Sequence, residues 1–277
     1  MQHVVDATPG PAPGAPGYGR TGGPYAVAHR GGAGLAVENT LEAFARSHAL
    51  GLRYLETDVR ATTDGVCALF HDSTLRRLTG SSARIRDLSW AQLRAERLPG
   101  DHRVPRLEEL LDAFPDGRLM IDLKDPRAIG PLARALRRSR AQARVCLAGG
   151  ADRWLADARA VIGSDVRTAM GWESLARLAA AARLGMRPRG VVPAQFVHLP
   201  LRLSVVPVFV ERLVTMVHDL GAELLIWTVD DPGSMHRLLD LGVDGVITDR
   251  PDLLREVLVS RGAWGSSEPS PPDRVAA

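Results

Sequence analysis

The sequence is short of three residue types, and each shortage says something about the protein. Of its 35 lysine and arginine residues only Lys124 is a lysine, Asn39 is the single asparagine, and there are 2 cysteines. Both Cys67 and Cys146 lie in apolar, strand-like runs, so we expect buried and reduced thiols rather than a disulfide framework. A background so poor in lysine indicates that Lys124 occupies a position where the planar fork of arginine does not serve and a compact charge does.

Several larger patterns are absent as well. No basic block is interleaved with aromatics, and the net charge is only +3 despite a pI near 9.3, so we expect no nucleic-acid binding. No membrane span is present, and residues 1–24 lack the charged start and apolar block of a secretory signal. We therefore expect a cytoplasmic protein without stable membrane insertion, and nothing in the sequence indicates an oligomeric state. Residues 1–24 and 262–277, rich in Pro, Gly and Ser, are expected to be disordered tails.

Between the tails, apolar strand-like runs alternate with helical patterns. A chain of 277 residues, 45% hydrophobic and 24% charged, has the length and composition of a soluble α/β barrel. The alternation predicts a (β/α)8 TIM barrel over residues 25–261. Its strands are expected at 25–29, 53–59, 118–123, 143–148, 166–170, 189–193, 223–228 and 243–247, and its helices at 39–50, 106–114, 127–139, 151–162, 172–184, 207–220, 232–241 and 251–260. An extra run at 66–70 is expected to form a hairpin, and residues 72–105 a small insertion after it, which either covers the site or is a structural excursion.

Polar side chains lie at the ends of the first two runs. His29 and Arg30 end the first run. Glu56 and Asp58 project together from the second run, because residues two apart in a strand share a face. In a barrel of this type the active site lies at the C-terminal ends of the strands, which is where these side chains are expected.

The hairpin and a third strand add to this group. The Asp-Gly pair within 61–65 predicts a tight turn that returns the chain to the carboxylates at His71. Asp122 and Lys124 share a face at the end of another predicted strand. Three carboxylates on neighbouring strands can hold a divalent cation through oxygen, and Mg²⁺ and Ca²⁺ suit them equally. Flanked by histidines, arginine and lysine, they describe a place for a phosphate ester; the expected metal ligands are Glu56, Asp58 and Asp122.

Seven motifs in this order and spacing resemble the glycerophosphodiester phosphodiesterase family over roughly residues 25–260. They are Ala28-His-Arg-Gly-Gly, Glu38-Asn-Thr-Leu-Glu-Ala-Phe44, Glu56-Thr-Asp58, Phe70-His-Asp-Ser-Thr-Leu75, Ile121-Asp-Leu-Lys124, Trp227-Thr-Val-Asp230 and Val243-Asp-Gly-Val-Ile-Thr-Asp-Arg-Pro251. Many members have Glu where Asp122 stands, Pro at Val37 and Asn at Asp230, and the shorter Asp122 leaves the metal ligand intact but can alter metal preference. The resemblance implies glycerol 3-phosphate and an alcohol as products.

The catalytic hypothesis assigns a role to each polar group. His29 and His71 would act as general acid and general base, in an order that the sequence leaves open. Arg30 and Lys124 would bind phosphoryl oxygens, and the nucleophile is either water or a substrate hydroxyl that forms a cyclic phosphate. Two alternatives remain: a related barrel phosphodiesterase acting on lysophospholipid head groups, and a barrel that binds phosphoesters without turnover.

Other residues receive lesser roles. Asn39, three residues before Glu42, is expected to cap a helix in a capping box, and Ser89 to cap a short helix in the insertion. Trp227 ends a strand and either walls the substrate or packs in the core. The other histidines, His198 included, are expected to be solvated or core residues rather than ligands, and Trp172 receives no role.

Overall fold

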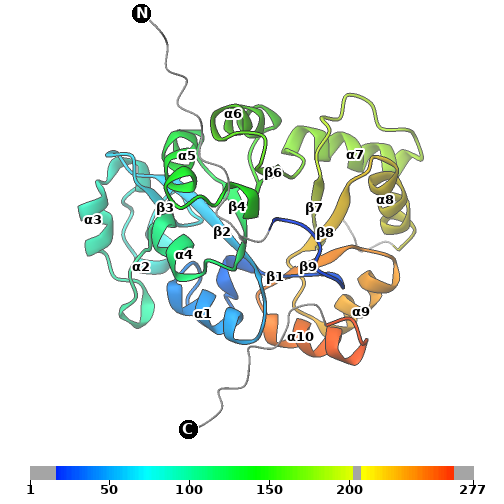
Figure 1. Ribbon diagram of the computed structural model, residues 1–277, viewed down its shortest axis with the longest axis horizontal. Helices are drawn as coiled ribbons and strands as arrows, with labels where there is room; N and C mark the ends of the chain where they lie inside the picture. The colour runs from blue at the N-terminus through cyan, green and yellow to red at the C-terminus, as the bar shows by residue number, and fades with distance from the viewer. Residues whose placement is uncertain (1–16, 202–206, 265–277) are drawn as a thin grey trace, which may run out of the picture.

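The computed structural model describes residues 17–201 and 207–264, and within them the predicted barrel is confirmed (Figure 1). Eight parallel strands pair in the order β6-β5-β4-β2-β1-β9-β8-β7. The ring closes between its end strands through a parallel bridge from Ala169 to Phe196, with a hydrogen bond of 2.8 Å from the Met170 amide to the Phe196 carbonyl. The strands are β1 (Tyr25–Ala28), β2 (Tyr54–Ala61), β4 (Arg118–Leu123), β5 (Val145–Ala148), β6 (Arg167–Thr168), β7 (Phe196–Pro200), β8 (Glu223–Trp227) and β9 (Gly245–Thr248).

Helices surround this ring and cover its outer face (Figure 1). Each presents an apolar stripe to the strands, and these stripes and the outward strand residues form one large buried cluster. A second cluster, mostly aromatic and apolar, fills the barrel interior. The main helices are α1 (Leu41–Ala49), α4 (Leu107–Ala113), α5 (Ile129–Arg138), α6 (Asp152–Ile162), α7 (Trp172–Leu184), α8 (Pro207–Asp219), α9 (Pro232–Asp240) and α10 (Pro251–Ser260).

One predicted strand is wrong: β7 spans Phe196–Pro200, not 189–193. The apolar pair at 191–192 misled the prediction, since Val192 is 47% exposed and Pro193 lacks an amide hydrogen for the sheet. From Phe196 onward the side chains alternate between the barrel interior and the helix layer, so both faces of the segment are buried. The shift of a few residues brings His198 into a strand.

The hairpin and the insertion behave largely as expected. Strand β3 (Cys67–Leu69) pairs antiparallel with the far end of β2. Residues 72–105 contain α2 (Arg76–Thr79), η2 (Ile85–Asp87), α3 (Trp90–Ala95) and η3 (Pro99–Asp101), packed around a small apolar cluster of their own. Ser89 caps α3 in a capping box, which confirms that prediction. The residues that line the main pocket include none from 72–105, so the insertion flanks the site without covering it.

The bottom of the barrel, at the N-terminal ends of its strands, is closed by residues 17–24, which were expected to be disordered. Tyr18 is buried edge-on against the rings of Tyr54 and Phe196, and Arg118 donates a hydrogen bond of 3.0 Å to the Gly17 carbonyl. Residues 17–24 thus belong to the barrel, because an aromatic ring in this stretch plugs its interior. Residues 262–264, also expected to be disordered, pack against the large buried cluster through Ala263 and Trp264, and the rest of the predicted tails, 1–16 and 265–277, lies outside the described residues. Within the described part of the chain, no helix combines the length and apolar character that crossing a bilayer demands.

Candidate active site

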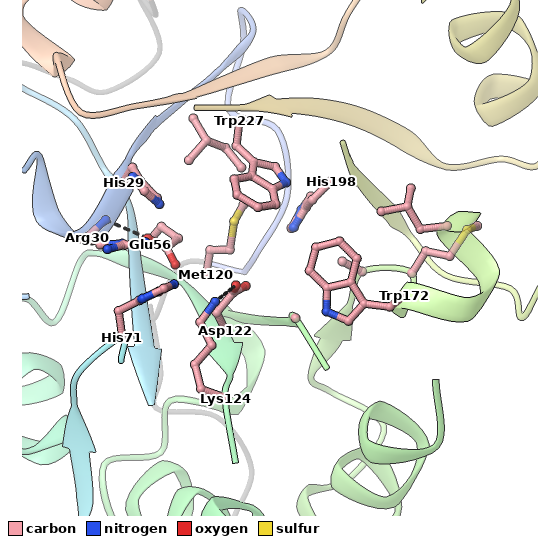
Figure 2. Close-up of a pocket in the computed structure, with 15 residues that line it drawn as sticks. His29, Arg30, Glu56, His71, Met120, Asp122, Lys124, Trp172, His198 and Trp227 are labelled. Atoms are coloured by element: carbon pink, nitrogen blue, oxygen red, sulfur yellow. Dashed lines mark hydrogen bonds and ion pairs between the residues drawn. The ribbon is translucent and has the colours of Figure 1, made fainter. Parts of the chain in front are cut away.

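Residues at the C-terminal ends of the strands line an open pocket (Figure 2). The predicted site residues that line it are His29, Arg30, Glu56, His71, Asp122, Lys124 and Trp227. Asp58 lies directly behind them, with 1% of its surface exposed. The structure therefore brings together every residue that the sequence assigned to the site.

The first histidine follows β1 in a tight turn, η1 (His29–Gly31). Arg30 adopts the left-handed backbone conformation (φ 49°, ψ 35°), which is uncommon for a side chain of this kind, and its amide donates a hydrogen bond of 2.7 Å to Glu56 Oε2. Gly31 must be glycine, because a Cβ there would lie 2.9 Å from the Phe44 ring. The turn thus fixes His29 and Arg30 against β2.

Each histidine is oriented by a carboxylate. His29 Nδ1 lies 2.7 Å from Asp249 Oδ1, and His71 Nδ1 lies 2.7 Å from Asp72 Oδ1. In both cases the second ring nitrogen is left for the pocket, the arrangement that fixes an imidazole for proton transfer. Asp249 was not among the predicted site residues, although it follows β9, the strand that pairs with β1.

Three carboxylates meet beside these histidines. Oxygens of Glu56, Asp58 and Asp122 all lie within 4.8 Å of one another. The sheet explains their meeting, because β2 and β4 pair with Asp58 directly opposite Asp122 and Glu56 lies two residues earlier on the same face. A Cβ on Gly149 would lie 3.0 Å from the Asp122 carboxylate, so glycine at this position leaves the carboxylate room.

Two cations share the cluster. Lys124 Nζ lies 3.1 Å from Asp58 Oδ1 and 2.9 Å from Asp122 Oδ2, bridging the two strands. Arg30 Nε lies 3.5 Å from Asp58 Oδ2, and its Nη1 is 3.0 Å from Glu38 Oε1. The only lysine of the chain thus stands where a compact ammonium fits between two carboxylates.

The electrostatic balance of the cluster is incomplete. Burial, and then the charges of Asp58 and Asp122, raise the pKa of Glu56 to about 8. Asp58 is just as buried, but Lys124, Arg30 and other donors outweigh its burial and lower its pKa. With Glu56 ionised, as binding of a cation requires, three carboxylates face two cations, and the negative charge left over, presented by oxygen ligands alone, fits a hard divalent cation.

The pKa values of the two histidines move in opposite directions. Burial opposes protonation of His29, but the hydrogen bond to Asp249 and the charge of Glu56 outweigh it and raise the pKa. For His71 burial dominates over the attraction of Asp58 and Asp72, so the pKa is lowered. One histidine is thus biased toward the protonated form and the other toward the neutral form.

Asn39 is not the helix cap that the sequence suggested. Thr40 caps α1 instead, its side chain accepting from the Ala43 amide. Asn39 is buried with a left-handed backbone, donates to Asp58 Oδ2 at 2.9 Å and accepts from the Thr57 hydroxyl at 2.7 Å. Its amide holds a carboxylate of the site, a role that its uniqueness in the chain could have signalled.

Glu38 supports the site from outside it. It accepts from Arg30 and from Arg77 of the insertion, and Arg77 also binds Asp72. The insertion is thereby linked to both His71 and Arg30 through a chain of ion pairs.

The wall of the pocket opposite Arg30 and His71 is mostly apolar. It contains two residues, Trp172 and His198, that were not predicted to belong to the site. Trp172, at the start of α7, is 45% exposed and meets Trp227 edge to face, with ring centroids 6.2 Å apart. His198, expected to be a solvated or core histidine, is buried in β7 and also lines the pocket, a placement that the mispredicted strand at 189–193 concealed. Met170 and Leu175 complete this wall.

The fold and the site together define a TIM-barrel protein whose pocket is suited to a phosphate ester. Comparison with known proteins narrows this class. Residues 29–253 match the model of the Glycerophosphoryl diester phosphodiesterase family, and the chain therefore belongs to that family.

Individual relatives agree with this assignment. The chain is 40% identical over 249 residues to the Mycobacterium tuberculosis protein "Probable glycerophosphodiester phosphodiesterase 2", covering 88% of this chain and 94% of that protein. It is 26% identical to a human lysophospholipase D, covering 84% and 85%. An Oleispira antarctica phosphodiesterase solved with its product sn-glycerol-3-phosphate has the same fold, with a TM-score of 0.68 at 20% identity over 84% of this chain and 96% of that one.

Proposed function

We propose that this protein hydrolyses glycerophosphodiesters to glycerol 3-phosphate and an alcohol, using a bound divalent cation and two histidines. The observation that carries the proposal is the convergence of His29, His71 and three carboxylates on one pocket. Family membership and the names of the relatives support the substrate class. The product seen in the Oleispira protein is the one that the proposed reaction releases.

A cation at Glu56, Asp58 and Asp122 would neutralise phosphoryl charge and polarise a phosphoryl oxygen. The chain's own groups then complete the binding of the phosphate. Arg30 and Lys124 line the same pocket and offer donors to phosphoryl oxygens, where negative charge grows in the transition state.

The two histidines divide the proton transfers. His71, whose pKa is lowered, is the general base that takes the proton from the attacking hydroxyl. His29, whose pKa is raised by its pairing with Asp249, is the general acid that protonates the leaving oxygen. Opposite shifts on two titratable groups in one pocket are the usual basis for such an assignment.

The test is release of glycerol 3-phosphate from a panel of glycerophosphodiesters by metal-stripped protein, with Mg²⁺, Ca²⁺ or Mn²⁺ added back. Metal-dependent release supports the proposal, and the panel identifies the preferred alcohol. A cyclic glycerol phosphate appearing first would show that a substrate hydroxyl, not water, is the nucleophile. A folded sample that binds the diesters and releases nothing under any metal would contradict the proposal and leave a binding barrel.

One observation favours a second substrate class, the lysophospholipids. The exposed Trp172 and the apolar side chains beside it offer a surface on which an acyl chain could lie. The similarity to a lysophospholipase D also points this way. Rates on glycerophosphocholine and on lysophosphatidylcholine, measured with the same sample, decide between the two classes.

A further inference from the structure

His198 lies at the edge of the apolar barrel interior, within electrostatic reach of Asp122. It lies in β7, two residues after Phe196, so both side chains point inward while Val197 and Leu199 pack against the helix layer. Phe196 belongs to the apolar interior cluster, and the two rings lie 6.2 Å apart. Apolar packing alone therefore does not explain why this position is a histidine.

The imidazole is buried, and one of its two ring nitrogens lacks a hydrogen bond to any described residue. His198 is 9% exposed, and its Nε2 has no hydrogen-bond partner among the described residues. Burial lowers its pKa to about 4, so the ring is neutral at neutral pH and presents one donor and one acceptor nitrogen. An unsatisfied buried polar group costs stability that an apolar residue of similar size would not, which suggests that the group is kept for a ligand.

The surroundings indicate the chemistry of that ligand. Figure 2 shows the imidazole beside the indoles of Trp172 and Trp227, which contact each other, on the opposite side of the pocket from Arg30 and His71. The phosphate is drawn toward the cations, whereas a neutral ring beside two indoles carries no charge that would hold an anion in preference to them. It suits an uncharged hydroxyl on a short carbon chain, because the hydroxyl can bond to the nitrogen while the carbons contact the indoles.

We propose that His198 is a specificity-determining residue that hydrogen-bonds a hydroxyl of the substrate's glycerol arm, an inference that rests on the proposed function. Every glycerophosphodiester carries this arm, whereas only some carry hydroxyls on the alcohol. His198 takes no part in proton transfer, so its role is binding and discrimination.

The test compares two ligands that differ only in their hydroxyls. Glycerol 3-phosphate and propyl phosphate share a phosphate and a three-carbon chain, and their affinities are measured by calorimetry with the cation present. We expect the wild-type protein to prefer glycerol 3-phosphate, and His198→Leu to reduce that preference roughly three- to tenfold, the worth of one net hydrogen bond. His198→Gln, which keeps a polar group near the Nε2 position, should restore part of it.

Stability separates this role from a structural one. His198→Leu should unfold at no lower temperature than wild type, since it removes an unsatisfied polar group from an apolar interior. The matched control is Phe196→Leu, on the same strand and face but not lining the pocket, which should lower the unfolding temperature and leave the ligand preference unchanged.

Two outcomes would overturn the inference. One is an unchanged ligand preference in folded His198→Leu. The other is a loss confined to hydrolysis of diesters with hydroxylated alcohols, which would place the hydroxyl on the other arm. The proposed function fails separately, if the wild-type protein releases glycerol 3-phosphate from no diester, and the binding comparison remains decisive in that case.

Discussion

Both ends of the barrel contain buried charged groups, but these groups are paired differently at the two ends. At the bottom, Arg20 pairs with both Glu223 and Asp244, and Tyr25 donates to Glu223 at 2.6 Å. His218 adds a second partner for Asp244 at 2.8 Å. At the top, three carboxylates face two cations, and the pKa of one carboxyl is raised to about 8.

The difference separates stability from chemistry. Paired charges over an aromatic plug close the bottom and hold the strands together. The top retains a buried carboxyl group with a raised pKa and an imidazole nitrogen without a hydrogen-bond partner among the described residues, which are unfavourable for folding and become favourable when a ligand binds. The predictions below test this division, beginning with the largest expected effect.

The largest effect on activity is expected from removal of the cation proposed to bind at the top of the barrel. Metal-stripped protein is expected to lose roughly 10³-fold or more in turnover, because the cation supplies several kcal/mol of transition-state stabilisation. Added cation should raise the unfolding temperature of wild type by mass action, but not that of Glu56→Gln. Glu223→Gln, at the bottom, is the control and should keep the full response to cation. Undiminished turnover after chelation would contradict the metal site.

Loss of either site histidine, His29 or His71, should have the second-largest effect on activity. His29→Ala and His71→Ala are each expected to fold normally and lose about 10²–10⁴-fold in kcat, the usual worth of a general acid or base. His218→Ala removes a histidine that is equally bound to a carboxylate, but at the bottom, and should leave kcat unchanged. Near wild-type turnover in either site variant would end the two-histidine scheme.

The candidate catalytic cluster was predictable because it depends on strand periodicity. Residues two apart share a face, and strand ends in a parallel barrel meet at one rim, so His29, Glu56, Asp58 and Asp122 could be brought together from spacing alone. The turn at 61–65 then returned His71 to the same level.

The apolar wall was not predictable in the same way. His198 was missed because an exposed apolar pair at 191–192 resembled a strand more strongly than Phe196–Pro200 did, and only tertiary pairing separates the two. Asn39 resembled a helix cap by local spacing, whereas its side chain is committed to Asp58 on another element. Local patterns specify elements; they do not specify which distant group a polar side chain meets.

At the bottom of the barrel, truncation of Tyr18 is expected to lower stability and to leave catalysis unchanged. Tyr18→Ala removes a buried ring that packs edge-on against Tyr54 and Phe196, and should destabilise the protein by about 3 kcal/mol. Chemical denaturation measures the loss, and kcat at a temperature where the variant is folded should equal that of wild type. Tyr18→Phe keeps the ring and should be nearly neutral, because the hydroxyl has no hydrogen-bond partner among the described residues. A large fall in kcat would show that the two ends are coupled.

The smallest expected effect is on the pH profile, and it distinguishes the two histidines at the top of the barrel from each other. The rate kcat/KM should rise as His71 loses its proton and fall as His29 loses its own, giving a bell-shaped pH profile. Asp72→Asn removes a group that favours protonated His71, so the pKa falls further and the acidic limb moves to lower pH, widening the bell. Asp249→Asn removes the hydrogen bond that outweighs burial at His29, so the basic limb moves to lower pH and the bell narrows.

Each limb should move by about one pH unit, which corresponds to roughly 1.4 kcal/mol of differential interaction. The profiles are measured from pH 5 to 10 with the cation saturating, so that metal loss does not shape either limb. The two variants move different limbs only if the acid and the base are distinct residues with the roles assigned above. If Asp249→Asn instead shifts the acidic limb, His29 is the base, and the opposite pKa shifts report the metal-free site rather than the working one.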